Sequence, residues 1–261
     1  MNLSLEGKNA VICGSSQGIG LAVAQELALL GANCILIARN AKSLSTAMNS
    51  LNRGLHQHHS FALADFTKPN EVRKAIDMIA TKQPVHILVN NTGGPPAGSL
   101  VEAKEEDFLH AFNQHLVNNH ILVKAVAPGM KRRKFGRIIN IISTSVKVPL
   151  PNLGVSNTIR AAVASWSKTM ANELGQYNIT VNNILPGYTE TKRLESLLSA
   201  NAKKKKQTIQ QTALEMMKDI PMKRFGSAAE IAAVAAFLAS PAASYVNGTS
   251  IPVDGGRTGS L

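Results

Sequence analysis

A short apolar strand, a glycine-rich turn, an amphipathic helix and a second apolar strand follow one another between Asn9 and Asn40. This succession constrains the fold more than any other stretch, because it predicts two parallel strands joined by a helix. The apolar positions of the helix recur about every 3.6 residues, at Ile19, Val23, Leu27 and Leu30. Gly31 is placed to end the helix in the left-handed conformation.

The turn after the first strand runs Gly14, Ser15, Ser16, Gln17, Gly18, Ile19, Gly20. Because its three glycines lack a Cβ atom, a pyrophosphate can approach the N–H groups at the helix N-terminus, where the helix dipole also favours an anion. The glycine spacing only approximates the Gly-x-Gly-x-x-Gly pattern of dinucleotide sites. The turn therefore predicts a nucleotide-binding site, with a turn that merely packs helix against strand as the alternative.

The second strand ends at Arg39 and Asn40, at about the distance where an NAD site offers Asp or Glu to the ribose 2′-hydroxyl. A guanidinium in that place suits a 2′-phosphate, so we predict that the chain prefers NADP(H) over NAD(H). The alternative is a solvated arginine at the end of a strand.

Length and composition predict a single α/β domain spanning 1–261, since 44% of the 261 residues are hydrophobic. No apolar run is long enough to cross a bilayer and the start does not resemble a signal peptide, so we expect a cytoplasmic protein without membrane contact. Cys13 and Cys34 fall in neighbouring strands, where cysteines are usually small apolar fillers, and no disulfide is expected.

The formal charge of +12 raises the question of a nucleic-acid or acidic partner. Much of this charge lies in two runs, Lys131–Lys134 and Lys203–Lys206, which are most simply solvated. No nucleic-acid motif or aromatic platform accompanies them, so no nucleic acid is expected. The histidines of His56–His59 are followed by no second cluster of ligands, and no metal site is predicted.

Apolar strands and helices keep alternating along the chain, which predicts a parallel sheet covered on both faces. Further strands are expected at 61–64, 85–89, 137–142, 180–185 and 250–253. Helices are expected at 41–51, 69–80, 105–130 and 228–238, with another that ends at 174. Between 187 and about 225 the pattern loosens into polar helical pieces rich in lysine, and this segment is the candidate lid.

Further motifs follow the glycine turn in order: Asp65-Phe66, Asn90-Asn91-Thr92-Gly93, Pro186-Gly187 through Thr191, and Val253-Asp254-Gly255-Gly256. Over nearly its whole length the chain resembles the short-chain dehydrogenase/reductase family, and in layout the 3-oxoacyl-acyl-carrier-protein reductases. The resemblance implies a doubly wound, Rossmann-like three-layer sandwich with about seven parallel strands, a cofactor at the carboxyl ends of the strands, and a homotetramer or homodimer.

The resemblance also implies which residues contact the cofactor. Besides the glycine turn, Arg39 and Asn40, these are Asp65 and Phe66 at the adenine, Asn91, Thr92 and Gly93 after the fourth strand, and Pro186, Gly187, Thr189 and Thr191 near the nicotinamide.

In that family a Ser, a Tyr and a Lys carry the chemistry, together with an Asn on the preceding long helix. The matching positions here are Ser143, Ser156, Arg160 and His115, so three of the four differ. A serine hydroxyl is far less acidic than that of tyrosine, and arginine keeps its proton, so the usual proton relay is excluded. Arg160 can still hold ribose hydroxyls and stabilise negative charge on the reacting oxygen, with hydrogen bonds from Ser143 and Ser156.

Among these four positions only His115 has a reference pKa near neutrality, about 6.5. We therefore expect His115 to supply the proton, directly or through water and a serine, with Tyr188 as the reserve acid. Loss of a general acid costs roughly 10²–10⁴ in rate. The alternative is that His115 has a purely structural place in its helix.

Together these features predict an NADP(H)-dependent oxidoreductase with an altered proton relay, acting on a carbonyl or hydroxyl group of a small molecule or of a 3-oxoacyl thioester. For a thioester substrate, the Lys131–Lys134 run is a candidate docking site for an acidic acyl carrier protein. Because three reaction positions differ, an inactive NADP(H)-binding sensor or assembly protein is the alternative.

Overall fold

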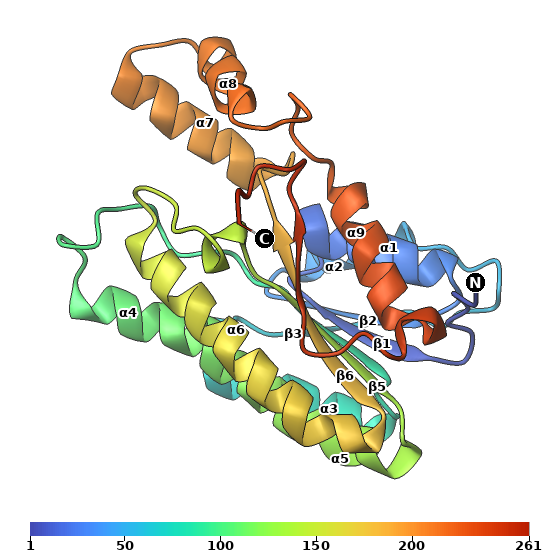
Figure 1. Cartoon of the computed structure of the whole chain (residues 1–261). Helices are drawn as coiled ribbons and strands as arrows, with labels where there is room; N and C mark the ends of the chain where they lie inside the picture. Colours follow the sequence, from blue (N-terminus) through green and yellow to red (C-terminus); the bar gives the residue numbers. More distant parts are fainter. Residues whose placement is uncertain (261) are drawn as a thin grey trace.

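The computed structural model describes residues 1–260, and within them seven strands form one parallel sheet (Figure 1). The strands are β1 (Asn9–Cys13), β2 (Asn33–Ala38), β3 (Ser60–Leu63), β4 (Ile87–Asn90), β5 (Gly136–Ile141), β6 (Ile179–Pro186) and β7 (Ser250–Val253). Their order across the sheet is β3-β2-β1-β4-β5-β6-β7, so the chain starts near the middle and winds outward in both directions. The predicted doubly wound sheet is confirmed.

Helices cover both faces of the sheet (Figure 1). One face carries α1 (Gly18–Leu29), α2 (Ala41–Asn49) and α9 (Ala228–Ala239). The other carries α3 (Pro69–Lys82), α5 (Asn118–Arg133) and α6 (Gly154–Leu174). On the first face α1 packs against α9, and on the second α3 packs against α5. The result is the expected three-layer sandwich.

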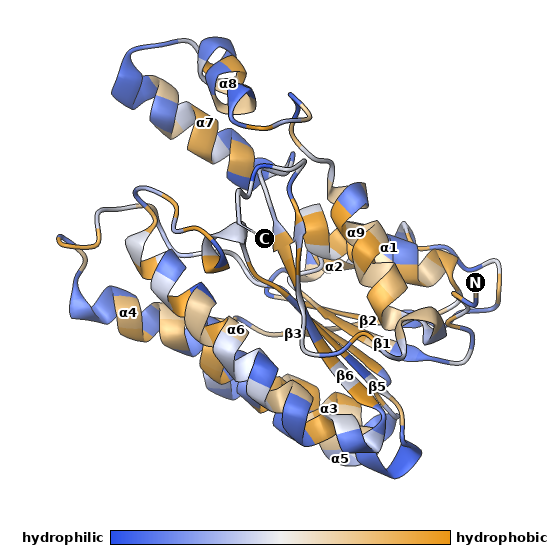
Figure 2. Ribbon diagram, viewed as in Figure 1, coloured by the Kyte–Doolittle hydropathy of each residue, from blue (hydrophilic) through white to orange (hydrophobic). Residues whose placement is uncertain are grey.

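The strands are apolar along most of their length because helices cover both sides of the sheet, as the orange strands of Figure 2 show. Cys13 and Cys34 lie inside this core as free thiols. Burial raises the pKa of both, that of Cys34 to about 12. The two cysteines therefore act as small apolar side chains, as their strand positions predict.

Three asparagines form a buried ladder across neighbouring strands. Nδ2 of Asn90 on β4 donates to Oδ1 of Asn140 on β5 at 2.8 Å, and Nδ2 of Asn140 donates to Oδ1 of Asn183 on β6 at 3.0 Å. The three residues lie opposite one another in the strand register and are almost fully buried. Amide-to-amide hydrogen bonds satisfy groups that water does not reach, and so hold these strands together where β4 leads into the site.

The helix expected at 105–130 is not uniform. It begins as α4 (Glu105–Phe112), widens into one π-helical turn at Asn113–Val117, and continues as α5 until Lys134 ends it in the left-handed conformation. His115 lies in the π turn, a feature that often occurs at functional sites. Apolar spacing alone does not distinguish such a turn from regular helix, which is why the sequence missed it.

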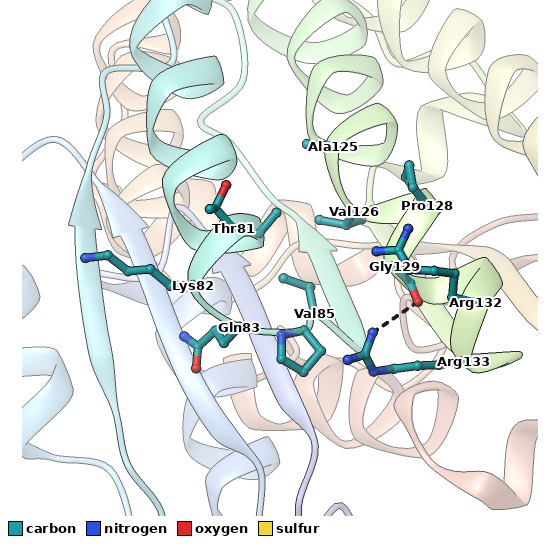
Figure 3. Close-up of a pocket in the computed structure, with 12 residues that line it drawn as sticks. Thr81, Lys82, Gln83, Val85, Ala125, Val126, Pro128, Gly129, Arg132 and Arg133 are labelled. Atoms are coloured by element: carbon teal, nitrogen blue, oxygen red, sulfur yellow. Dashed lines mark hydrogen bonds between the residues drawn. The ribbon is translucent and has the colours of Figure 1, made fainter.

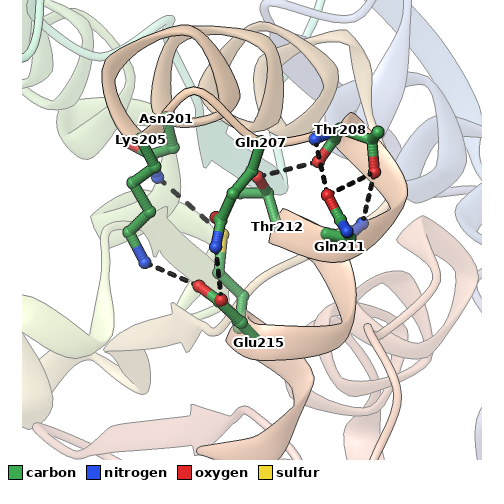
Figure 4. A network of polar contacts seen from close by, with 8 residues as sticks. Asn201, Lys205, Gln207, Thr208, Gln211, Thr212 and Glu215 are labelled. Carbon is green, nitrogen blue, oxygen red and sulfur yellow. Dashed lines mark hydrogen bonds and ion pairs between the residues drawn. The ribbon is translucent and has the colours of Figure 1, made fainter.

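The polar helical pieces expected between 187 and 225 are α7 (Lys192–Lys205) and α8 (Ile209–Lys218), which extend away from the sheet (Figure 1). Polar contacts join them: Glu215 on α8 accepts from Nζ of Lys205 at 2.8 Å and from Nε2 of Gln207 at 2.7 Å (Figure 4). These contacts are largely exposed, so they stabilise the pair of helices only weakly. Within residues 1–260, no helix has the length and apolar character needed to span a bilayer.

Candidate active site

The glycine turn lies between β1 and α1, where the strand order switches direction between β1 and β4. Gly14 has a φ of +59°, and a Cβ atom on it would lie 2.5 Å from the carbonyl oxygen of Asn91. Asn91 also donates from Nδ2 to the carbonyls of Cys13 at 3.3 Å and Gly14 at 3.2 Å. The turn therefore has no room for a side chain at Gly14, and its backbone is held open toward the N-terminus of α1, as a phosphate-binding turn requires.

A cavity of about 580 Å³ opens at the carboxyl ends of the strands. Of the residues expected at the site, its lining contains Gly14, Gln17, Gly18, Ile19, Asn91, Thr92, Gly93, Ser143, Ser156, Arg160, Pro186, Gly187, Thr189 and Thr191. The remaining expected residues, Ser15, Ser16, Gly20, Arg39, Asn40, Asp65, Phe66 and His115, lie outside the lining. The fold thus brings the segments that follow β1, β4, β5 and β6, together with the start of α6, around one space.

The residues expected near the adenine are mostly occupied by local contacts. Oδ1 of Asn40 accepts the N–H of Ser43 at 2.9 Å and caps α2. The N–H and hydroxyl of Thr67 donate to Asp65 and lower the pKa of its carboxyl. Arg39 is exposed at the end of β2 and pairs with no acidic side chain within residues 1–260. Of these residues, Arg39 therefore has the side chain best suited to take up a phosphate.

The opposite part of the cavity holds the residues expected to carry the reaction. Ser143 follows β5, and its Oγ accepts the N–H of Ser145 at 3.1 Å. Ser156 lies near the start of α6, with Arg160 one turn further on. Arg160 is only 8% exposed and donates from Nη1 to the carbonyl of Ile141 at 3.1 Å. Burial, together with the charge of Arg193, lowers the pKa of Arg160 to about 10, so the guanidinium remains a cation at neutral pH.

His115 lies behind the cavity wall and is 1% exposed. Its Nδ1 shares a hydrogen bond of 2.7 Å with Oγ1 of Thr92, and its Nε2 has no partner within residues 1–260. Burial, with the charge of Arg160 nearby, lowers the pKa of His115 to about 2, so the imidazole is neutral at pH 7. His115 is thus linked to the cavity through the side chain of Thr92, which belongs to the lining.

Sequence reasoning missed several residues of the lining, among them Leu153, Arg193 and Arg257. Nη2 of Arg193 donates to the carbonyl of Pro95 at 2.8 Å. The guanidinium of Arg257 lies 4.5 Å from the ring centre of Tyr188, the reserve acid, which also lines the cavity. Neither arginine belongs to a motif. Each does follow one closely in sequence, Arg193 after the segment that ends at Thr191 and Arg257 after Gly256.

A second, smaller cavity of about 260 Å³ lies at the other end of β4 (Figure 3). Its lining includes Arg132 and Arg133, and Nη1 of Arg133 donates to the carbonyl of Gly129 at 3.4 Å. Cations at the end of a helix are stabilised by the helix dipole, which accounts for these arginines at the end of α5. The basic run Lys131–Lys134 is therefore separated from the large cavity by the length of the strands.

Comparison with known proteins agrees with this geometry. The family model described as enoyl-(acyl carrier protein) reductase matches residues 14–258. The NADPH-dependent reductase BacG of Bacillus subtilis is 32% identical over 256 residues, which cover 97% of this chain and 99% of the relative. The 3-oxoacyl-[acyl-carrier-protein] reductase FabG of Pseudomonas aeruginosa is 35% identical over 258 residues, which cover 97% of this chain and 98% of the relative.

Among solved structures, the L-sorbose reductase from Gluconobacter frateurii, complexed with NADPH and L-sorbose, is similar with a TM-score of 0.93. It is 32% identical, and the match covers 100% of both chains. Motifs, strand order, family match and full-length relatives all agree. The chain belongs to the short-chain dehydrogenase/reductase family.

Proposed function

We propose that this short-chain dehydrogenase/reductase is an NADP(H)-dependent oxidoreductase that reduces a carbonyl group of a small molecule, or oxidises the corresponding hydroxyl, with an altered proton relay. The observation that carries the proposal is that the glycine turn and Arg160 line the same cavity. The cofactor fits because Gly14 and Gly18, both with positive φ, line the cavity at the start of α1, where a pyrophosphate can approach the backbone N–H groups. Bound NADP(H) supplies or accepts the hydride.

The chain's own residues then act on the reacting oxygen. Arg160, a buried permanent cation, stabilises the negative charge that develops on that oxygen during reduction. The hydroxyls of Ser143 and Ser156 lie in the same part of the cavity and donate hydrogen bonds to it. Because charge stabilisation contributes strongly in an enclosed site, this set can support turnover without the usual tyrosine.

Thr92 is the residue through which His115 acts. His115 is not part of the cavity lining, whereas Thr92 is, and the hydroxyl of Thr92 is fixed by the hydrogen bond to Nδ1 of His115. In this scheme the reacting oxygen takes its proton from a water bound at the Thr92 hydroxyl, and the hydroxide that remains regains a proton from bulk solvent. His115 is a positioning residue in this scheme, because it orients Thr92 without touching the substrate.

A double-mutant cycle tests this arrangement. His115→Asn and Thr92→Ala should each lower kcat about tenfold, the effect of one lost hydrogen bond, and the double variant should lose no more than either alone. NADPH oxidation with a panel of carbonyl compounds gives kcat. NADPH fluorescence gives the dissociation constant, which should stay unchanged in His115→Asn. A loss of roughly 10²–10⁴ for His115→Asn, with little effect of Thr92→Ala, would instead make the imidazole a general acid.

The second candidate function is an inactive NADP(H)-binding sensor or assembly protein. The observation that favours it is Ser156 at the place where the family has its acidic tyrosine, which leaves the cavity without that proton donor. NADPH binding without turnover of any carbonyl compound in the panel, in either direction, would support this reading over the enzymatic one.

We also propose that α7 and α8 form a lid over the substrate end of the cavity. Lys192, Arg193 and Leu197 line the cavity from α7, and Glu215 on α8 bonds to Lys205 and Gln207. A pair of helices held in this way can move as a unit when a ligand binds. Slower proteolysis within 187–225 in the presence of NADPH and substrate would support lid closure.

A small substrate suits this molecule better than a carrier-bound thioester. The Lys131–Lys134 run expected to dock an acyl carrier protein lies at the amino ends of the strands, whereas the cavity opens at their carboxyl ends. A carrier docked on the run would face away from the cavity. A homodimer or homotetramer remains our proposal from the family resemblance, and size-exclusion chromatography with light scattering would test it.

A further inference from the structure

Three arginines, Arg160, Arg193 and Arg257, line the large cavity. The acidic side chain of the lining is that of Glu190, and none of the three arginines forms an ion pair within residues 1–260. Guanidinium groups are recognised best by planar anions such as carboxylates, which accept two hydrogen bonds at once. The excess of cations in the lining therefore indicates an anionic ligand.

Two of these arginines meet at one point of the wall, beside Gly94. A Cβ atom on Gly94 would lie 3.5 Å from Nη2 of Arg160 and 3.9 Å from Nη2 of Arg193. The hydrogen bonds of both guanidinium groups run to backbone carbonyls, those of Ile141 and Pro95. Each guanidinium has five N–H donors, so both retain donors for one shared carboxylate.

The guanidinium groups of Arg160 and Arg193 repel each other when no ligand lies between them. Arg160 is buried, and the charge of Arg193 adds to burial in lowering its pKa. Like charges that approach in a partly enclosed site repel more strongly than in water. Within residues 1–260, no acidic side chain forms an ion pair with either arginine. An anion bound between them would offset the repulsion.

We assign the phosphates of the cofactor to the N-terminus of α1, as its dipole and free N–H groups favour. The N-terminus of α1 lies near Thr191, since a Cβ atom on Gly18 would be 3.4 Å from Cγ2 of that residue. Arg193, in contrast, reaches the loop after β4 through Pro95. The remaining wall includes apolar side chains, those of Leu150, Leu153 and Leu197.

We propose that the substrate is a carboxylate-bearing carbonyl compound, an oxo acid or the matching hydroxy acid, whose carboxylate is held between Arg160 and Arg193 beside Gly94. The leucines of the wall contact its carbon chain. The inference rests on the proposed function for the carbonyl group, whereas the carboxylate site exists whether or not the protein turns the compound over.

Calorimetry on the full chain, with and without NADPH, tests the carboxylate site directly. The probes are pyruvate, 2-oxobutanoate and 2-oxohexanoate, each paired with its methyl ester. At least one acid should bind about tenfold more tightly than its ester, as charge-assisted hydrogen bonds predict. Arg193→Met should remove this preference, Arg193→Lys should retain part of it, and Lys204→Met, which removes the same charge from α7 outside the lining, should keep it.

The outcomes separate the carboxylate site from the proposed function. Equal binding of every acid and its ester overturns the inference. So does a weaker NADPH affinity in Arg193→Met with the acid preference intact, because Arg193 would then serve the cofactor phosphates. If the wild-type protein binds no NADPH but keeps an Arg193-dependent acid preference, the proposed function fails and the carboxylate site stands.

Discussion

The two ends of the cavity are built from different parts of the polypeptide. At the proposed cofactor end the site is backbone: Gly14 and Gly18 lie in the turn that leads into α1, and Asn91, after β4, donates to the carbonyls of Cys13 and Gly14. At the reaction end the site consists of side chains, with Arg160 and Ser156 where the family has lysine and tyrosine. The first end matches the family motifs, and the second departs from them.

This difference indicates that a fold can keep a binding site made of backbone while the side chains that carry its chemistry change. A glycine turn depends on the absence of side chains, so replacing one of its glycines disturbs the conformation of the backbone. Side chains at the reaction end can be exchanged without disturbing the strands that hold them, provided that buried charges remain compensated. We therefore expect substitutions at the two ends to differ in size and in the quantity that they change.

The largest effect is expected from Gly14→Ala. The new Cβ atom would press on the Asn91 carbonyl at 2.5 Å in a backbone conformation that alanine rarely adopts, which should raise the NADPH dissociation constant about 100-fold. Gly98→Ala is the matched control, because Gly98 lies outside the cavity lining and no atom lies within 4 Å of its added Cβ. Fluorescence titration gives both constants. Equal affinities in the two variants would contradict a cofactor end built from backbone.

A smaller effect at the same end is expected from Arg39→Ala. Loss of the exposed guanidinium should weaken NADPH about tenfold and leave NADH unchanged, since only NADPH carries the 2′-phosphate. Arg132→Ala removes the same charge near the second cavity and serves as the control. If NADH loses as much affinity as NADPH, Arg39 does not select the cofactor.

The smallest effect concerns the reaction end and pH. His115 titrates near 6.5 when unfolded but has a pKa of about 2 when folded, so between these values the unfolded state binds more protons and stability rises with pH. From pH 7 to pH 6 this histidine should remove about 0.7 kcal/mol of stability. Between pH 7 and pH 6, the free energy of unfolding of His115→Asn should therefore fall by about 0.7 kcal/mol less than that of the wild type. Urea unfolding at the two pH values measures this difference. His86, whose pKa falls to about 4, is present in both proteins and cancels.

Much of the architecture could be predicted because it depends on local patterns. Apolar strands, helical spacing and the turn Gly14–Gly20 are properties of neighbouring residues, and they predicted the alternation and the doubly wound sheet. The same holds for the lining residues after β1, β4 and β6, because the carboxyl ends of parallel strands meet at one edge. Local patterns were less reliable at the π turn around His115, where the helical spacing is interrupted.

The sequence by itself determined the family and the sheet and predicted the cofactor end, since these follow from short stretches with strong conformational preferences. Only the tertiary structure decided that His115 contacts Thr92, and that Arg160 and Arg193 meet at Gly94. These contacts join segments that are distant along the chain, and their distances and burial depend on how whole helices pack. Because burial and neighbouring charge set a group's pKa, the chemistry of the reaction end is a property of the folded molecule.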